Sequence, residues 1–395
     1  MDLLQGYESA TSDYAPSPPR LKRKAASSLA HAIKLPTPNA AAYQPKRRAI
    51  ARAPSSAPKD PEPLPTLLDA GTVPPAAAVS DATVPSRELQ RWRASYRINC
   101  VRWNPRFPSL LATAGMSSTM HIFDAFRAVC KRQLDGLHTD AIKDVQWVLD
   151  GQSLVSASYD RTLVHVDVET MQARATYTGT HRFTALAMHP SDMHLVLAGD
   201  DAGHVVCWDL RDRQPARALQ QTCGEVHALA FLPDMASPRS RTQFLSTSTV
   251  TKTSAADKAV AVWDFDSGAL VKQCIYSQGY TCSSISVHPT APYLALQSHG
   301  NYIATVSTRT LKLSKRRYEG HTSQGYGVHC SFNATGSLLA SGDVHGHVYV
   351  YEAQRPRLLF SARPHTNVCM TVQCHPRYPH VLATGGWDNI VTVWT

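Results

Sequence analysis

A short motif recurs through most of this 395-residue chain at intervals of about 43 residues. Each copy closes an apolar or alternating run and ends in Trp-Asp or a degenerate version of it. The seven copies are Phe123-Asp124, Val166-Asp167, Trp208-Asp209, Trp263-Asp264, Val306-Ser307, Tyr351-Glu352 and Trp394-Thr395, at intervals of 43, 42, 55, 43, 45 and 43 residues. Short strands repeated with a period of about 40 to 45 residues are typical of the blades of a β-propeller. The sequence therefore predicts an all-β domain of seven blades.

A second landmark, a residue followed by proline, repeats in register with the first. Its copies are Asn104-Pro105, His189-Pro190, Leu232-Pro233, His288-Pro289 and His375-Pro376. Each lies between two apolar runs, as expected of a tight turn between the first two strands of a blade. Pro233 lies 30 residues before its anchor and the other four prolines lie 17 or 18 before theirs. This difference predicts an insertion in blade four, at about 235–256.

The composition changes near Arg87, where we place the domain boundary. Fourteen of the 26 prolines fall at or before Pro85, among Ala, Ser and Thr, and no Asp or Glu occurs between Tyr14 and Pro58. Such a segment buries too little apolar surface to offset the entropy of ordering it. We therefore expect a disordered, basic Pro/Ala-rich tail over 1–87 and the propeller over 88–395.

The tail carries candidate signals for a nuclear protein. Two short basic clusters match the charge that a nuclear import receptor recognises, although a solvated basic tail is the alternative. The candidate residues are Lys22, Arg23, Lys24, Lys46, Arg47 and Arg48. Ser17 and Thr37, each followed by Pro, are candidate phosphosites that would weaken the neighbouring positive field. We expect a nuclear location, with the cytoplasm as a further possibility.

The end of the chain predicts how the ring closes. Trp394 is the penultimate residue, so blade seven lacks an outer strand, and an open ring would leave an unpaired edge. We expect residues 88–96 to supply this strand and to join the two ends of the propeller.

On these repeats, the chain from about Arg91 to Thr395 resembles the WD-repeat family, and the fold expected is a seven-bladed WD-repeat β-propeller. In that family a buried tetrad of His, Ser or Thr, Asp and Trp braces each blade. The resemblance implies a full structural tetrad in blade seven, formed by His365, Thr384, Asp388 and Trp394. Blade two has His138, Ser156 and Asp160 with Val166 in place of Trp, and Ser117, Ala202, Gly300 and His345 replace Asp in other blades.

Longer segments resemble one branch of that family. These are SYDRTLVHVDVET, STSTVTKTSAADKAVAVWDF, HGNYIATVST and KRRYEGHTSQGYGV. The branch includes second-step pre-mRNA splicing factors. The resemblance implies a nuclear scaffold that binds proteins, including spliceosomal ones.

Several function classes are disfavoured. No nucleophile elbow, phosphate-binding Gly-rich motif or paired carboxylates occur at suitable spacing, so we expect neither an enzyme nor a cofactor. The repeated His-Pro turns are spread around the ring, so the 18 histidines predict no metal site. No apolar run approaches the roughly 18 to 20 residues of a membrane span, and nine scattered cysteines without a Cys-x-x-Cys pair suggest reduced, mostly buried thiols inside the cell. We expect a monomer.

Two local features keep alternative functions open. A basic run lies between blades five and six, near Tyr302 and Tyr318, and predicts a loop that contacts RNA phosphates or a partner, with the tyrosines available for base stacking. Its residues are Arg309, Lys312, Lys315, Arg316 and Arg317. A solvated loop is the alternative explanation of that run.

The second feature is a short motif in blade three, formed by Trp208, Asp209 and Arg211. It resembles the Trp-Asp-x-Arg motif of substrate receptors for cullin-type ubiquitin ligases. An arginine that pairs with a neighbouring carboxylate would give the same sequence. The sequence thus leaves three hypotheses: a splicing-associated scaffold, a propeller that binds RNA directly, and a ligase substrate receptor.

Overall fold

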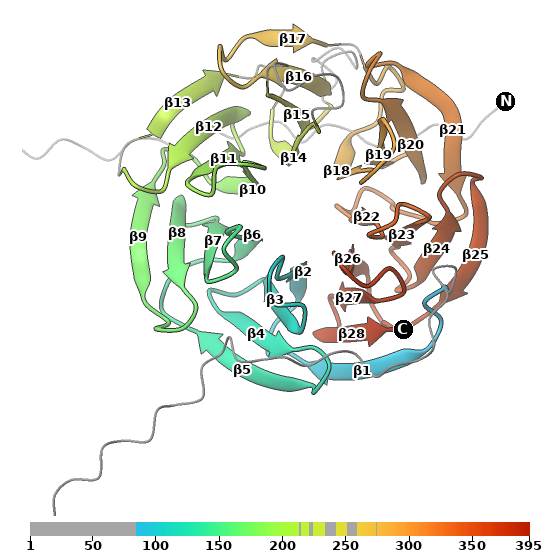
Figure 1. Ribbon diagram of the computed structural model, residues 1–395, viewed down its shortest axis with the longest axis horizontal. Helices are drawn as coiled ribbons and strands as arrows, with labels where there is room; N and C mark the ends of the chain where they lie inside the picture. Colours follow the sequence, from blue (N-terminus) through green and yellow to red (C-terminus); the bar gives the residue numbers. More distant parts are fainter. Residues whose placement is uncertain (1–83, 213–214, 221–223, 234–241, 251–258, 274) are drawn as a thin grey trace, which may run out of the picture. The chain divides into compact units, whose positions relative to one another are not determined.

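The computed structural model describes residues 84–395 except 213–214, 221–223, 234–241, 251–258 and 274 (Figure 1). The import candidates, the phosphosites and most of the predicted tail therefore lie outside the described residues. Most of the predicted insertion at 235–256 also lies outside the described residues, but residues 243–248 within that range form a strand.

The described chain forms seven antiparallel four-stranded sheets arranged as blades around a central axis (Figure 1), which confirms the predicted fold. Blade one contains β2 (Ile98–Trp103), β3 (Leu110–Gly115), β4 (Met120–Asp124) and β5 (Val129–Leu134). Blade two contains β6 (Ile142–Trp147), β7 (Ser153–Ser158), β8 (Thr162–Asp167) and β9 (Ala173–Thr178). Blade three contains β10 (Phe183–Met188), β11 (Leu195–Asp200), β12 (His204–Asp209) and β13 (Pro215–Gln220).

The remaining blades follow the same order from the axis outward. Blade four contains β14 (Val226–Phe231), β15 (Gln243–Ser248), β16 (Val260–Asp264) and β17 (Leu270–Lys272). Blade five contains β18 (Cys282–Val287), β19 (Tyr293–Ser298), β20 (Tyr302–Ser307) and β21 (Leu313–Glu319). Blade six contains β22 (Cys330–Phe332), β23 (Leu338–Gly342), β24 (Val348–Glu352) and β25 (Arg357–Ala362), and blade seven contains β26 (Cys369–Cys374), β27 (Leu382–Gly386), β28 (Ile390–Trp394) and β1 (Glu88–Arg93). The described residues include no helix long and apolar enough to cross a membrane.

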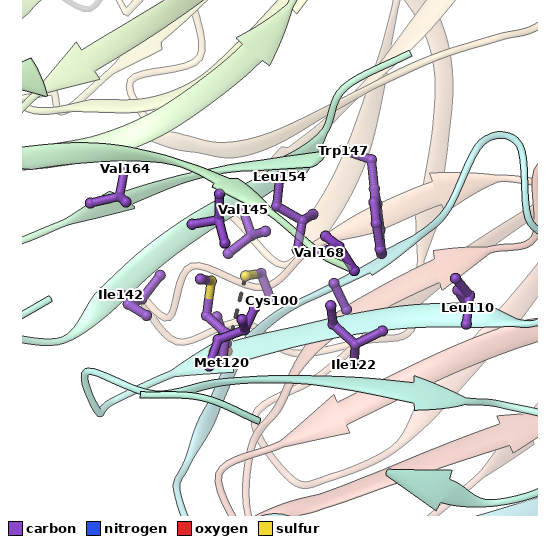
Figure 2. Close-up of a cluster of buried hydrophobic side chains, with 14 residues drawn as sticks. Cys100, Leu110, Met120, Ile122, Ile142, Val145, Trp147, Leu154, Val164 and Val168 are labelled. Atoms are coloured by element: carbon purple, nitrogen blue, oxygen red, sulfur yellow. Dashed lines mark hydrogen bonds between the residues drawn. The ribbon is translucent and has the colours of Figure 1, made fainter. Parts of the chain in front are cut away.

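Each repeated anchor ends the third strand of a blade, which is why the 43-residue period marks the blades. Trp208 and Trp263, for example, lie next to last in β12 and β16. The three inner strands of a blade are buried on both faces because each sheet packs against the next one. Between blades one and two, Cys100, Ile122, Val145 and other side chains interdigitate in one such cluster (Figure 2).

The ring closes through the first described strand. β1 pairs antiparallel with β28, and Trp92 lies opposite Val391. Backbone hydrogen bonds between Arg87 and Thr395, of 3.0 and 2.9 Å, extend this ladder to the last residue. The Trp92 ring also lies 4.8 Å from that of Phe123 in blade one. Blade seven is therefore built from both ends of the described chain.

In three of the five repeated turns, the residue before proline connects one blade to the next. In blade seven, Nδ1 of His375 accepts hydrogen bonds from the backbone N–H groups two and three residues later, both at 3.0 Å, and Nε2 donates to Pro108 O in blade one at 2.9 Å. Asn104 in blade one makes the same three bonds with its amide, and the last of them reaches Gly151 O in blade two at 2.8 Å. His288 does so from blade five to Gly336 in blade six. An imidazole and an amide thus serve the same structural purpose.

Removal of the closing strand tests how much the ring depends on it. A chain that begins at Ala94 leaves the outer edge of β28 unpaired and exposes the apolar side of blade seven. We expect its melting temperature to fall by about 10 °C or more, with association into larger species. A chain that begins at Val84 is the control and should melt as the full chain does. Equal melting of both shortened chains, measured by circular dichroism and size-exclusion chromatography, would contradict this role of β1.

The turn residue His375 gives a pH-dependent prediction. Burial lowers the pKa of His375 to about 4, below the roughly 6.5 of an unfolded histidine. The unfolded chain therefore binds the proton first, so the stabilisation is complete above about pH 6.5 and declines as the pH falls towards 4, by up to about 1.4 kcal/mol per pH unit. In His375→Asn, which copies Asn104, we expect a weaker dependence on pH and a small loss of stability at pH 7.5.

His375→Ala is the matched variant, because it leaves the Pro108 carbonyl and two backbone N–H groups without the imidazole. We expect it to lower the free energy of unfolding at pH 7.5 by about 1–3 kcal/mol. Urea titrations at several pH values measure both effects. Equal losses in the two variants at pH 7.5 would show that the amide does not replace the imidazole. An unchanged pH slope in His375→Asn would show that His375 does not cause the pH dependence.

Candidate functional site

In the predicted tetrad of blade seven, His365 and Asp388 lie in loops at one face of the ring, and the other two members lie in β27 and β28. His365 Nδ1 lies 3.0 Å from Asp388 Oδ1, and His365 Nε2 lies 3.0 Å from Thr384 Oγ1. The indole N–H of Trp394 points to the same hydroxyl at 3.4 Å. Burial alone would raise the pKa of Asp388, but hydrogen bonds from His365 and from two backbone N–H groups lower it below its usual value. The four side chains satisfy one another and hold the loops of this blade.

Blade two contains a related triad that has the connectivity of a hydrolase centre. Ser156 Oγ lies 2.7 Å from His138 Nε2, and His138 Nδ1 lies 2.9 Å from Asp160 Oδ2. Ser156 is completely buried and its hydroxyl also donates to Val164 O at 3.3 Å. A nucleophile must reach its substrate, so this triad is suited to bracing the blade and not to acyl transfer.

The prediction that the basic run forms a loop is wrong for three of its five residues. Lys315, Arg316 and Arg317 belong to β21, the outer strand of blade five, and Arg309 and Lys312 lie in the turn that precedes it. An outer strand faces solvent along one edge, where charged side chains discourage pairing with other strands. A dense run of positive charge is therefore compatible with a strand at this position.

The two tyrosines near this run are not available for base stacking. Tyr318 and Tyr302 are both buried. The Arg317 guanidinium lies 4.6 Å from the centre of the Tyr302 ring, and that of Arg316 lies 5.1 Å from the Tyr293 ring. Arg316 also donates to Ala353 O in blade six at 3.3 Å. Arg316 and Arg317 thus pack on the propeller, whereas Arg309, Lys312 and Lys315 are exposed to solvent.

The predicted ligase-adaptor motif lies where β12 ends. Trp208 is buried, and the Arg211 guanidinium pairs with the Asp209 carboxylate through contacts of 2.6 and 2.9 Å. The Arg211 side chain remains 60% exposed. The structure therefore shows the local ion pair that was the alternative explanation, and the adaptor role stays a prediction.

A polar cavity of about 270 Å³ follows the axis of the ring, lined by the innermost strands. Arg102 and Asp144 form an ion pair of 2.7 Å within it, and the other Asp144 oxygen accepts the Leu186 N–H at 3.1 Å. Burial, followed by the nearby Arg102 and Lys143 charges, lowers the pKa of His329 to about 3. Arg102 is therefore paired and His329 is uncharged at neutral pH, whereas Lys143 adds a positive charge to the lining.

The innermost strands all begin at one end of this cavity, which we call the top face, and end at the other, the bottom face. At the bottom face a second cavity of about 430 Å³ is lined by residues from the ends of these strands, including Trp103, Trp147 and Phe231. Leu149 and Met193 are exposed at that face.

The top face carries an aromatic cluster that sequence reasoning did not identify. Trp387 and Tyr326 meet edge to face, with ring centres 5.4 Å apart, and the Arg97 guanidinium lies 5.8 Å from the Trp387 ring. The backbone N–H of Met116, whose side chain is 50% exposed, donates to Arg97 O at 2.9 Å. We call Arg97, Met116, Tyr326 and Trp387 the top-face cluster. Blades one, six and seven supply its members, so no sequence spacing connects them.

Trp387 also has a buried polar group that is not satisfied. Its indole N–H has no hydrogen-bond partner among the described residues. A buried donor without an acceptor is unfavourable by about 1–3 kcal/mol. Because this N–H is itself buried, the parts of the cluster that a partner can reach are the partly exposed rings and the exposed Arg97 side chain. Tryptophan, tyrosine and arginine are also the residue types that most often dominate binding energy at interfaces.

Comparison with known proteins identifies the repeats. The family described as WD domain, G-beta repeat matches residues 129–167, 314–352 and 357–395. Each matched segment ends at or just after an anchor of the 43-residue period. The predicted resemblance to WD-repeat proteins is therefore confirmed.

Curated relatives align with most of the propeller. Mouse WD repeat-containing protein 25 is 28% identical over 319 residues, which are 80% of this chain and 58% of that protein. Human Pre-mRNA-processing factor 17 is 24% identical over 317 residues, 79% of this chain and 52% of that protein. The yeast protein of the same name is 25% identical over 285 residues, 70% of this chain and 59% of that protein. The chain thus spans between half and three fifths of the length of these relatives.

The packing of the basic strand gives a prediction that separates structural from free charges. Arg316→Ala removes the contact with the Tyr293 ring and the hydrogen bond to Ala353 O, and should lower the free energy of unfolding by about 1–2 kcal/mol. Lys315→Ala, one residue earlier and exposed, should change it by less than about 0.5 kcal/mol. Urea titration of both variants provides the measurement, and equal effects would show that Arg316 does not brace blades five and six.

Proposed function

Because this chain carries WD40 repeats and folds as a seven-bladed WD-repeat propeller, we propose that it is a non-enzymatic scaffold that binds proteins in nuclear pre-mRNA splicing complexes. The single observation that carries the binding role is the top-face cluster, in which a partly exposed aromatic pair lies beside the exposed Arg97 and Met116. Exposed aromatic side chains beside arginine are typical of the centre of a protein interface.

The relatives alone support a role in splicing, because no geometric feature of the described residues points to it. Two of the relatives are named pre-mRNA-processing factors, and they align with 70 to 79% of this chain. Related propellers diverge in their loops, so similarity in fold does not transfer a partner. We therefore assign the class of partner from the similar proteins, and the binding surface from this chain's own residues. The nuclear location belongs to the same proposal.

The geometry favours a scaffold over the two alternatives. For direct RNA binding, Arg316 and Arg317 pack on tyrosine rings, and Arg309, Lys312 and Lys315 are too few to act as an extended phosphate-binding surface. For a ligase substrate receptor, the Asp209 carboxylate already holds Arg211. The buried Ser156 similarly argues against catalysis in blade two.

Recovery of partners from nuclear extract tests the proposal. The tagged full chain is purified with and without ribonuclease, and bound proteins and small nuclear RNAs are identified. We expect spliceosomal proteins to remain after ribonuclease treatment. Their loss with the RNA would indicate tethering through RNA, and recovery of cullin-ligase components alone would indicate the ligase alternative. Either result would overturn the proposal.

Matched surface variants locate the interface. Arg97→Glu combined with Met116→Glu places negative charge on the top-face cluster through two exposed side chains, so the fold should be preserved. We expect recovery of the partners to fall by about tenfold or more, as when a central interface residue is lost. Leu149→Glu combined with Met193→Glu places two glutamates at the bottom face and should not reduce recovery. If the bottom-face pair abolishes recovery and the top-face pair does not, the assigned surface is wrong.

A further inference from the structure

Blade three lacks the His, Ser or Thr, and Asp side chains that brace blades two and seven. At the positions of His138, Ser156 and Asp160, it has Gly179, Ala198 and Ala202. None of these residues offers a side-chain hydrogen bond, so the loops of blade three must be held in another way. Different polar side chains occupy this part of the top face, namely His181, Asp200 and His204.

We propose that His181, Asp200 and His204 form a binding site for a divalent transition-metal ion, with Zn²⁺ as the best match. The three residues come from three segments: His181 lies between β9 and β10, Asp200 ends β11, and His204 begins β12. One potential ligand atom from each residue lies within 4.8 Å of the other two. The two imidazole rings face each other with centres 5.2 Å apart. This proposal is independent of the scaffold function.

The carboxylate at the centre of the triad is already fixed in position. The Asp200 side chain is nearly buried, and its Oδ1 accepts the backbone N–H groups of Ala202 and His204 at 3.0 and 2.8 Å. Its Oδ2 lies 3.0 Å from His204 Nδ1. The Asp200 and His204 ligands are therefore preorganised. The His181 side chain, 42% exposed, is free to make the small movement that shortens the ligand distances.

The donor set suits zinc. Two imidazole nitrogens and one carboxylate oxygen are the protein ligands of many zinc sites that keep a coordination position open. A neutral imidazole carries one proton, so His204 can bind the ion through Nδ1 when its proton is carried on Nε2. The ion then takes the place of the proton that Nδ1 shares with Asp200. No group needs to change its charge for this exchange.

Space and charge around the triad set the expected affinity. A cavity of about 280 Å³ lies beside it, lined by Arg161, Thr180, His181, Arg182 and Asp201. Asp201 Oδ1 lies 3.9 Å from His181 Nδ1 and adds a second carboxylate. The two arginines oppose a further positive charge and favour water or an anion at the open position. We therefore expect micromolar binding, weaker than that of a closed structural zinc site.

Blade six provides an internal comparison for this assignment. Asp343 and His347 occupy the positions of Asp200 and His204, and Asp343 Oδ1 accepts the N–H groups of His345 and His347 at 2.9 and 2.7 Å. There, the hydroxyl of Tyr349 donates to Asp343 at 3.3 Å. Within the described part of the chain, only the blade three triad brings three such ligands together. The Asp-His pair is therefore a turn shared by both blades, and His181 is the addition that completes a metal site.

A titration with Zn²⁺ tests the proposal on the full chain without a polyhistidine tag. The protein also carries Cys130→Ser, because Cys130 is an exposed thiol and thiolates are zinc ligands. After removal of metal by a chelator, we expect isothermal titration calorimetry to show one site of micromolar affinity. Co²⁺, used as a spectroscopic substitute, should give visible absorption bands of four- or five-coordinate geometry.

The variants decide the assignment. His181→Ala should weaken Zn²⁺ binding by about tenfold or more, and it replaces an exposed side chain, so circular dichroism should remain unchanged. His347→Ala, the matched control in blade six, should leave the affinity within twofold of the parent. The proposal is overturned if no site tighter than about 1 mM is found, or if His181→Ala binds as the parent does. Equal weakening by both variants would also overturn it.

Discussion

The pairing of β1 with β28 is the interaction on which the rest of the structure depends. Each blade packs its two faces against neighbouring blades, so no blade is complete unless the ring is closed. The pairing supplies the hydrogen bonds of the last edge, and the side chains around it form the core between blades seven and one. Ile98, Val101 and Trp103 of β2 pack there with Val391 and Val393 of β28. The hydrogen bonds between β1 and β28 thus hold β28 in place, and blades one and seven pack together beside it.

Hydrogen bonds from a turn in one blade to a turn in the next hold neighbouring blades together. Asn104, His288 and His375 each hold their own turn and reach a carbonyl of the following blade. This explains why histidine and asparagine both precede proline in the repeat. The sequence identified these residues as structural because they are spread around a ring, but it did not show the bond to the next blade. That bond depends on how two blades meet, which a single repeat does not contain.

The fold could be predicted from the sequence wherever the same kind of residue has the same structural role in every blade. The anchors mark the third strands because a buried apolar residue followed by a polar one ends the same strand in every blade. The basic run failed as a predictor of a loop because β21 borders solvent, where lysine and arginine are compatible with a strand. Tyr302 and Tyr318 likewise seemed available until the structure placed both in the core. The top-face cluster had no sequence signal, since Arg97 and Trp387 are separated by nearly the whole propeller.

Loss of the tetrad provides a physical reason for differences between blades. In blade seven, His365 and Asp388 satisfy each other, which fixes the loop that carries Trp387 and leaves its aromatic ring as the group available to a partner. In blade three, the small residues at the tetrad positions form no such side-chain hydrogen bonds, and the polar groups of His181 and Asp201 remain near solvent. The ring tolerates both arrangements because packing between sheets and the bonds between turns hold each blade in place. Blade seven, with its tetrad, therefore presents an aromatic ring at the top face, whereas blade three presents polar side chains there.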